Sequence, residues 1–145
     1  MNILCVCTGN VCRSPMLEAL LQRELEKQGF TDFTVRSAGT MTNDGMMPTP
    51  QAITAMQEIG IDISEHVSRQ GTPALAAETD AFVALTTKHG VDLVFYHGAD
   101  PKKIIVPGEG IPDPFGSPLP VYRECRDSLI EAMPQVIEDL KALWV

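Results

Sequence analysis

Ile3-Leu4-Cys5-Val6-Cys7-Thr8-Gly9-Asn10-Val11-Cys12-Arg13-Ser14-Pro15 is the stretch of the sequence that decides the fold. Its first four residues form an unbroken apolar run, which is typical of a strand buried on both faces of a parallel sheet. Pro15 suits the first position of a helix that Ser14 would cap, and leucines follow with helical spacing at positions 17, 20, 21 and 25. The stretch therefore predicts a loop that joins the C-terminal end of a strand to the N-terminus of a helix.

This loop has the composition of an anion-binding site. A short loop in this position can turn several backbone N–H groups inward, and Gly9 and Asn10 ease the unusual dihedral angles that this requires. The helix adds roughly half a positive charge at its N-terminus. Arg13 supplies a planar guanidinium that binds two phosphate oxygens at once. We therefore expect the loop to bind a phosphate-sized dianion.

Cys7, at the start of the loop, faces the same donors. The loop amides, the helix dipole and the guanidinium all favour the thiolate over the thiol, and the thiolate is the nucleophilic form. We therefore predict that Cys7 is a catalytic nucleophile and that Arg13 belongs to the same catalytic site. The other loop residues predicted to bind the substrate are Thr8, Gly9, Asn10, Val11, Cys12 and Ser14.

Length and composition favour one domain spanning residues 1–145. A chain of 145 residues with 44% hydrophobic content can bury a sizeable core without disulfides or metals. Its net charge of −8 argues against nucleic acid or an anionic membrane surface as a partner. No apolar stretch is long enough to cross a bilayer, and the four cysteines do not form a secreted disulfide framework. We therefore expect a cytoplasmic protein with free thiols.

The rest of the chain alternates predicted strands with predicted helices. This order is typical of an α/β domain of three layers, with a four-stranded parallel sheet flanked by helices. Pro134 lies inside the last helix, where we expect it to cause a kink or a break. The predicted strands after the first are 34–37, 81–85 and 104–106. After the helix that follows the first strand, one predicted helix opens at Thr49-Pro50, a short one opens at Thr72-Pro73, a third ends near Gly98, and the last runs from about Pro120 towards Trp144.

Asp113 is the candidate general acid. It lies between two prolines in a loop shortly after the fourth predicted strand, and ligands in open α/β sheets bind at the C-terminal ends of the strands. Cleavage of a phosphate ester needs a proton for the leaving oxygen, which a carboxylic acid near the loop can supply. The alternative is that Ile111-Pro112-Asp113-Pro114 is only a rigid turn.

Taken together, these motifs resemble the low-molecular-weight protein tyrosine phosphatase family, in its bacterial branch near the protein-arginine phosphatases. The similarity extends over nearly the whole chain. It is carried by Cys7-x5-Arg13-Ser14-Pro15-Met16, Ser37-Ala38-Gly39-Thr40, Thr49-Pro50-Gln51-Ala52, Ile61-Asp62-Ile63-Ser64 with His66, and Asp113-Pro114-Phe115-Gly116.

The resemblance implies a mechanism in two steps that needs no cofactor. Cys7 attacks phosphorus and forms a phosphocysteine while Asp113 protonates the leaving group. Asp113 then acts as the base for the water that releases inorganic phosphate, and Arg13 stabilises the charge on the equatorial oxygens. The substrate would be a phosphorylated protein.

Several residues have two interpretations. Ser14 either hydrogen-bonds Cys7 or only caps the helix. Cys12 either forms a reversible disulfide with Cys7, as in relatives that share this pair, or is a buried hydrophobe. We expect Cys5 and Cys125 to be core residues. A zinc site formed by Cys5, Cys7 and Cys12 lacks a fourth ligand. The three histidines, His66, His89 and His97, are expected at the surface or in caps, although His66 lies in the part of the chain that supports the active-site loop in this family.

The substrate class depends on the walls of the pocket. Val11 favours an aryl phosphate, because protein-arginine phosphatases of this family carry threonine at that position. Phe115 is the one aromatic residue beside Asp113-Pro114, and the loop after the second strand offers Met41, Met46 and Met47 instead of an aromatic. We therefore predict a phosphotyrosine phosphatase, with a protein-arginine phosphatase as the alternative. A thiol-dependent arsenate reductase would need a further cysteine pair that is missing between Arg13 and Glu124, and a phosphate-binding module without catalysis would not need Cys7, Arg13 and Asp113 together.

Overall fold

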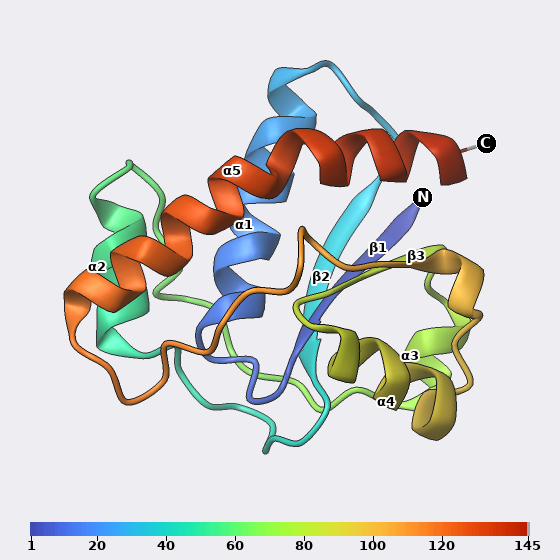
Figure 1. Cartoon of the computed structure of the whole chain (residues 1–145), viewed down its shortest axis with the longest axis horizontal. Coiled ribbons are helices and arrows are strands. Elements are labelled where there is room, and N and C mark those ends of the chain that lie inside the picture. The colour runs from blue at the N-terminus through green and yellow to red at the C-terminus, as the bar shows by residue number, and fades with distance from the viewer. Residues whose placement is uncertain (145) are drawn as a thin grey trace.

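A four-stranded parallel sheet forms the centre of the computed structural model, which describes residues 1–144 (Figure 1). The strands lie in the order β2-β1-β3-β4, so β1 is central and β4 is an edge strand. Every neighbouring pair is parallel, which confirms the predicted fold class. The strands are β1 (Asn2–Cys7), β2 (Thr34–Gly39), β3 (Ala81–Ala84) and β4 (Ile104–Ile105).

Helices connect the strands and cover both faces of the sheet (Figure 1). The threonine–proline pairs start helices as predicted: the hydroxyls of Thr49 and Thr72 accept hydrogen bonds from N–H groups of the first turn, and a proline follows each. The helices are α1 (Arg13–Lys27), α2 (Pro50–Gln57), α3 (Pro73–Ala77), α4 (Thr87–His97), the 3-10 helix η1 (Pro101–Lys103) and α5 (Leu119–Leu143). None of them is long and apolar enough, within residues 1–144, to cross a membrane.

Alternate residues of β1 face two separate cores, as expected for a strand covered on both sides. Ile3, Cys5 and Cys7 belong to the larger core, which the sheet shares with α1, α2 and α5. Leu4 and Val6 belong to the smaller core under α3 and α4. The three-layer arrangement therefore places Cys7 at the C-terminal end of the central strand, against the larger core.

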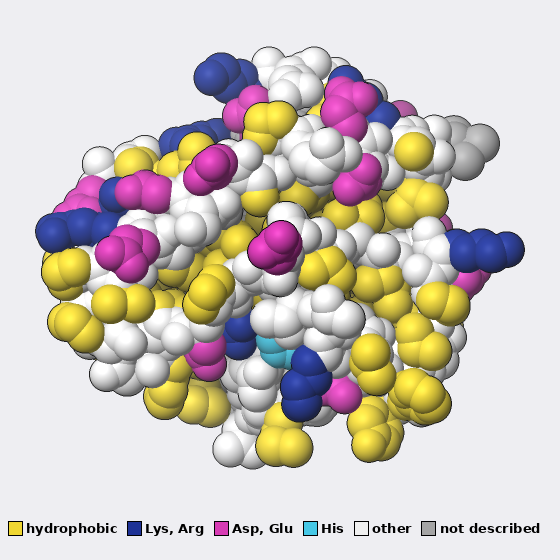
Figure 2. Space-filling model, viewed as in Figure 1, with side chains coloured by type: hydrophobic (Ala, Val, Ile, Leu, Met, Phe, Trp, Pro, Cys, Tyr) yellow, Lys and Arg dark blue, Asp and Glu magenta, His cyan; other side chains and the backbone are white. Residues whose placement is uncertain are grey.

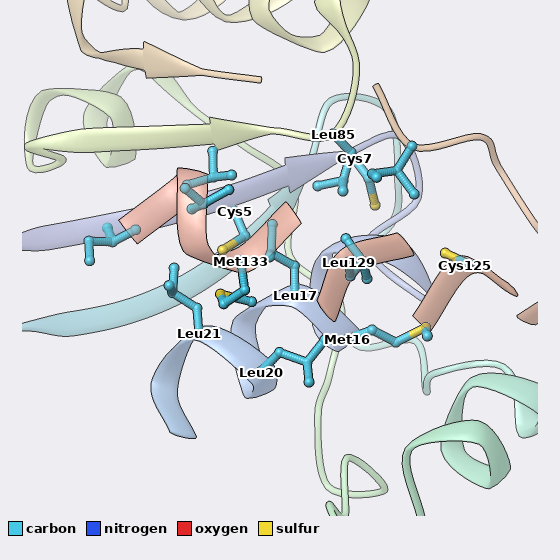
Figure 3. Packing of buried hydrophobic residues seen from close by; sticks show 14 of the residues in the cluster. Cys5, Cys7, Met16, Leu17, Leu20, Leu21, Leu85, Cys125, Leu129 and Met133 are labelled. Carbon is cyan, nitrogen blue, oxygen red and sulfur yellow. The ribbon is translucent and has the colours of Figure 1, made fainter. Parts of the chain in front are cut away.

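The larger core holds α5 against α1 and the sheet. Figure 3 shows Leu129 and Met133 of α5 beside Leu17 and Leu21 of α1, with Cys5 of β1 next to them. Full burial of each such side chain contributes about 1.5–3 kcal/mol. Cys125 lies in the same core, so the prediction that Cys5 and Cys125 are core residues is confirmed.

Two details of the helices bear on the sequence prediction. Helix α1 begins at Arg13 with Cys12 at its N-cap position, so Ser14 lies inside the first turn and is not the cap. Helix α5 continues through Pro134, which is exposed, so of the two expected outcomes, a kink or a break, there is no break. The helix does change direction near its middle (Figure 1).

Candidate active site

The loop between β1 and α1 is held in place by hydrogen bonds between its carbonyl groups and the surrounding segments. Cys7 O accepts from Thr40 N at 2.9 Å, and Thr8 O accepts from Met41 N at 3.1 Å. The next three carbonyls of the loop also face partners from other segments: Gly9 O accepts from Thr42 Oγ1, Asn10 O lies 3.0 Å from His66 Nε2, and Val11 O accepts from Thr49 N. Five successive carbonyls therefore point outward, into the protein.

This arrangement turns the loop amides toward one point. In a planar trans peptide the N–H of each residue points opposite to the carbonyl of the residue before it. The outward carbonyls therefore aim the N–H groups of residues 8–12 to the inside of the loop. The Asn10 N–H shows this direction, because it donates to Cys7 Sγ at 3.3 Å. The result is the ring of donors that an anion needs, at the N-terminus of α1.

Asn10 allows the chain to turn in this way. It has a φ of 56°, in the left-handed region that asparagine tolerates better than most residues, and it is completely buried. Its side chain bridges two parts of the site: Nδ2 donates to Ser14 Oγ at 2.8 Å, and Oδ1 accepts from Arg69 N at 2.9 Å. The Asn10 side chain therefore supports the loop from behind, and only its backbone faces the anion position.

Ser14 Oγ lies 2.9 Å from Cys7 Sγ. Since Ser14 Oγ already accepts a hydrogen bond from Asn10, its own proton is left to donate to the sulfur. This hydrogen bond holds the sulfur in position at the start of the loop. Of the two interpretations of Ser14, the geometry matches the hydrogen bond to Cys7.

Arg13 is buried with its guanidinium fixed beside the loop. Nη1 donates to Ile111 O at 2.8 Å, and Nη2 lies 3.5 Å from Asp113 Oδ2. Nε is buried and has no hydrogen-bond partner within residues 1–144. An orphaned N–H of this kind is costly in a folded protein unless a ligand satisfies it. A phosphate oxygen held by the loop amides is such a ligand.

Asp113 reaches the mouth of the loop from the segment after β4. Its Oδ1 accepts from Phe115 N at 3.1 Å and lies 3.7 Å from Cys12 Sγ, which donates to it. Its side chain is 49% exposed. The carboxyl group is therefore oriented by the protein, but it remains accessible to a leaving group and to water.

These residues surround a pocket of about 310 Å³. Most of the residues predicted from sequence line it, whereas Asn10 and Ser14 lie behind the loop. Three side chains of the rim are strongly exposed: Met41 at 79%, Phe115 at 65% and Met46 at 45%. Thr42 and Asn43 were not predicted. The lining residues are Cys7, Thr8, Gly9, Val11, Cys12, Arg13, Met41, Thr42, Asn43, Met46, Asp113 and Phe115.

Comparison with known proteins agrees with this geometry. The profile of the low molecular weight phosphotyrosine protein phosphatases matches residues 2–143. The chain belongs to this family. The predicted family and the prediction of a cysteine-dependent protein phosphatase are thereby confirmed.

Individual relatives of this phosphatase carry two different names. The protein-arginine-phosphatase of Bacillus subtilis is 35% identical over 148 residues, which cover 97% of each chain. The probable low molecular weight protein-tyrosine-phosphatase EpsP of Ralstonia nicotianae is 31% identical and covers 98% of this chain and 97% of its own. A structure of the YwlE arginine phosphatase, a mutant with a phosphorylated active-site serine, has a TM-score of 0.89 and 34% identity, and covers 97% of this chain and 96% of its own.

His89 takes part in the N-terminal cap of α4, as expected for a capping histidine, but its contact with the phosphate loop of this phosphatase was not predicted. It is buried on α4, with Nε2 2.8 Å from Thr8 Oγ1 and Nδ1 2.9 Å from Thr86 Oγ1. Burial, and then the charge of Arg13, lower the pKa of His89 to about 4, so the ring is neutral at physiological pH. The pattern Thr86-x-x-His89 was a possible signal, but a helix cap next to a histidine is too common to indicate an active site.

The remaining thiols differ from Cys7 in their surroundings. All four cysteines are free and buried. Burial raises the pKa of Cys5 and of Cys12, and it raises the pKa of Cys125 to about 12. These three thiols are therefore protonated at neutral pH. Residues 1–144 contain no group of three His, Cys, Asp or Glu side chains that could hold a metal ion, so the zinc alternative has no site there.

Proposed function

We propose that this phosphatase hydrolyses phosphotyrosine in proteins, with Cys7 as nucleophile and Asp113 as general acid. The observation that carries this proposal is the convergence of inward amides and the unpaired Arg13 Nε on one anion position beside Cys7 Sγ. A phosphoryl group in that position would place phosphorus next to the nucleophile, and the same donors would stabilise the charge of the transition state.

The reaction would proceed in two displacements. Cys7 Sγ forms a bond to phosphorus as the bond to the phenolic oxygen breaks, and Asp113 gives its proton to that oxygen. Asp113, now ionised, accepts a proton from the water that attacks the phosphocysteine, which releases inorganic phosphate and restores the thiolate. Arg13 balances the equatorial oxygens throughout. Support for a phosphorylated intermediate comes from the YwlE structure, whose active-site serine carries a phosphate.

The walls of the pocket favour an aryl group over a guanidinium. Val11, Met41, Met46 and Phe115 present apolar atoms around the opening. A tyrosine ring buries favourably against such walls. A guanidinium needs hydrogen-bond acceptors, and Asp113, which the proposed mechanism requires as an acid, is the one carboxyl group among the residues that line the pocket. The apolar walls therefore support phosphotyrosine as the substrate, and a protein-arginine phosphatase is the alternative.

A direct comparison of two substrates tests the specificity. We would measure kcat/KM for a phosphotyrosine peptide and for a phosphoarginine peptide of the same sequence, with the Cys7→Ser protein as the blank. We expect a clear preference for phosphotyrosine, which Val11→Thr reduces. A preference for phosphoarginine would overturn the substrate proposal while leaving the roles of Cys7, Arg13 and Asp113 intact.

The proposal includes a location and a set of partners. We place the enzyme in the cytoplasm, where reducing conditions keep Cys7 as a free thiol. Its partners would be phosphorylated proteins, with inorganic phosphate as the product. Nucleic acid and membrane surfaces are not expected as partners, because the net charge of −8 opposes binding to polyanions.

A further inference from the structure

The outer surface of α4 exposes three large apolar side chains to solvent. Phe95 is 78% exposed, Tyr96 75% and Val91 48%. Figure 2 shows hydrophobic side chains gathered over α4, at the lower right of the molecule. Single exposed apolar residues are common, but a cluster of three on one helix is typical of a surface that binds another molecule.

A groove runs beside this cluster, between α4 and the edge strand β4. It has a volume of about 350 Å³, and its lining is mostly apolar. The strand β4 is two residues long and has no neighbour on its outer side among the described strands. An apolar groove next to a free strand edge suits an extended peptide, which buries alternate side chains in the groove. The residues that line the groove are Thr87, Gly90, Val91, Val94, Phe95, Pro101, Ile104 and Val106.

The segment that contributes the lining of the groove carries a small positive charge in a chain that is otherwise strongly acidic. Segment 87–106 carries three lysines against two aspartates, whereas the whole chain has a net charge of −8. Lys102 and Lys103 form no ion pair within residues 1–144, and Lys88, which pairs with Asp92, is 84% exposed. The charge of this region is therefore complementary to an acidic segment.

The groove begins close to the active site. Thr87 lines one end of the groove, and the adjacent Thr86 lies 2.9 Å from His89 Nδ1. His89 in turn contacts Thr8 of the phosphate loop. The groove-lining Thr87 is therefore connected to the loop through Thr86 and His89, and a peptide that enters the active site can continue along α4.

We propose that the α4 groove (residues 87–106) is a docking site for the protein substrate. It binds an extended segment, flanking the phosphorylated residue, in which apolar and acidic side chains alternate. The inference rests on the proposed function, since it concerns the substrate of the same active site. A second copy of the chain is a poorer occupant, because a twofold contact would bring two positively charged regions together.

The dimensions set the length of the docking segment. Helix α4 has 11 residues and is therefore about 16 Å long. An extended chain covers this length with about five residues, and a few more are needed to reach the phosphate loop. A peptide with a phosphotyrosine and eight flanking residues on one side thus reaches the far end of the groove.

The test compares phosphotyrosine peptides that differ only in the flank. One flank alternates Glu and Leu over eight residues, the control flank alternates Lys and Leu, and each is placed either before or after the phosphotyrosine. We expect the Glu/Leu flank, on one of the two sides, to raise kcat/KM by about tenfold over the Lys/Leu flank, through a lower KM. p-Nitrophenyl phosphate, which has no flank, reports the activity of the site itself.

Two variants and a matched control locate the effect. Phe95→Ser and Lys102→Glu should each abolish the advantage of the Glu/Leu flank and leave turnover of p-nitrophenyl phosphate unchanged. Lys27→Glu makes the same change of charge at the end of α1, outside the groove, and should keep the advantage. Equal kcat/KM for the two flanks in the wild-type protein would overturn the docking proposal.

Direct binding separates this proposal from the proposed function. The fluorescence anisotropy of labelled, unphosphorylated Glu/Leu and Lys/Leu peptides reports docking without turnover. Tighter binding of the Glu/Leu peptide that Phe95→Ser abolishes would support docking, even if no phosphotyrosine peptide were hydrolysed and the proposed function failed. Self-association of the wild-type protein that Phe95→Ser removes would instead show that a second copy covers the groove, and would overturn the proposal.

Discussion

His89 Nε2 lies 2.8 Å from Thr8 Oγ1 and connects α4 to the phosphate loop across 81 residues of sequence. Because the pKa of buried His89 is lowered to about 4, the unfolded chain binds a proton at pH values where the folded protein does not. The stability contributed by the neutral ring is therefore complete above pH 6.5, and it is lost as the pH falls towards 4.

We accordingly predict that the free energy of unfolding decreases between pH 6.5 and 4.5, and that His89→Gln flattens this dependence. The glutamine can still contact Thr8 but has no proton to bind in this range. Urea unfolding of both proteins at pH 7.0, 5.5 and 4.5 measures the effect. The groups that also act on the ring, chiefly Arg13, with Lys88, Asp92 and Asp113, are the same in both proteins. Parallel curves would rule out His89 as the source.

Cys7→Ser should abolish turnover and leave phosphate binding measurable. The serine hydroxyl is a far weaker nucleophile than a thiolate, so we expect kcat to fall by at least about 10³-fold. The amides and Arg13 remain in place, since the loop is held by its carbonyl groups rather than by the sulfur. Calorimetric titration with inorganic phosphate measures the binding that remains. A variant that kept a tenth of the activity would show that Cys7 is not the nucleophile.

Asp113→Ala should slow the enzyme most for substrates with poor leaving groups. Protonation of the leaving oxygen contributes about 10²–10⁴-fold for a phenol, and much less for p-nitrophenol, which leaves readily as an anion. Since Asp113 also lies 3.5 Å from Arg13, Asp113→Asn serves as a matched variant that keeps the shape of the side chain. The measurement is kcat for phenyl phosphate and for p-nitrophenyl phosphate, and we expect the larger loss for phenyl phosphate. An equal loss for both substrates would contradict the acid role.

Gly39→Ala should displace the phosphate loop. A Cβ at Gly39 would lie 2.5 Å from Thr8 O and 2.8 Å from Thr42 Cγ2, and a backbone carbonyl cannot yield without moving the loop. We expect a loss of about 1–3 kcal/mol in stability and a higher KM. Gly29→Ala is the control, because its Cβ meets nothing within 4 Å and it adds only the strain of a positive φ. Unfolding curves and kcat/KM are measured for both variants. If Gly39→Ala changed them no more than Gly29→Ala does, the loop would be undisturbed and the prediction wrong.

The sequence predicted the parts of the candidate site that carry a recognisable local pattern, and it missed contacts that support the loop from distant elements. Cys7 and Arg13 were predicted because a nucleophile, a guanidinium fork and a helix N-terminus occur within a few residues of one another, and Asp113 because of the Asp-Pro pair downstream; all three line one pocket. His89 and Arg69 support the same loop from positions 81 and 59 residues away from the atoms they contact. No local pattern marks such contacts, because they depend on how the segment before α3 and helix α4 pack against the loop that follows β1.

The helix boundaries show the same division between local and tertiary signals. Thr49-Pro50 and Thr72-Pro73 start helices where local cap chemistry places them. Ser14 does not cap α1, because Asn10 and Cys7 engage its hydroxyl and the helix already begins at Arg13. The hydrogen bonds that Ser14 makes with Cys7 and Asn10 thus override the cap signal of the local sequence.

Cys12→Ser should keep the activity but lose recovery after oxidation. Hydrogen peroxide converts the Cys7 thiolate to a sulfenic acid; the Cys12 thiol then condenses with it, forming the disulfide and releasing water. Cys12 needs to lose its proton for this step, and its Sγ already donates to Asp113 Oδ1 at 3.7 Å, so a base is in place although burial raises the pKa of the thiol. Without Cys12 the sulfenic acid is open to further, irreversible oxidation.

We therefore expect wild-type activity to return on treatment with dithiothreitol after a peroxide pulse, whereas the Cys12→Ser protein stays inactive. Cys125→Ser, which removes another buried thiol of the same core, should recover like the wild type. Equal recovery of all three proteins would make Cys12 a packing residue only.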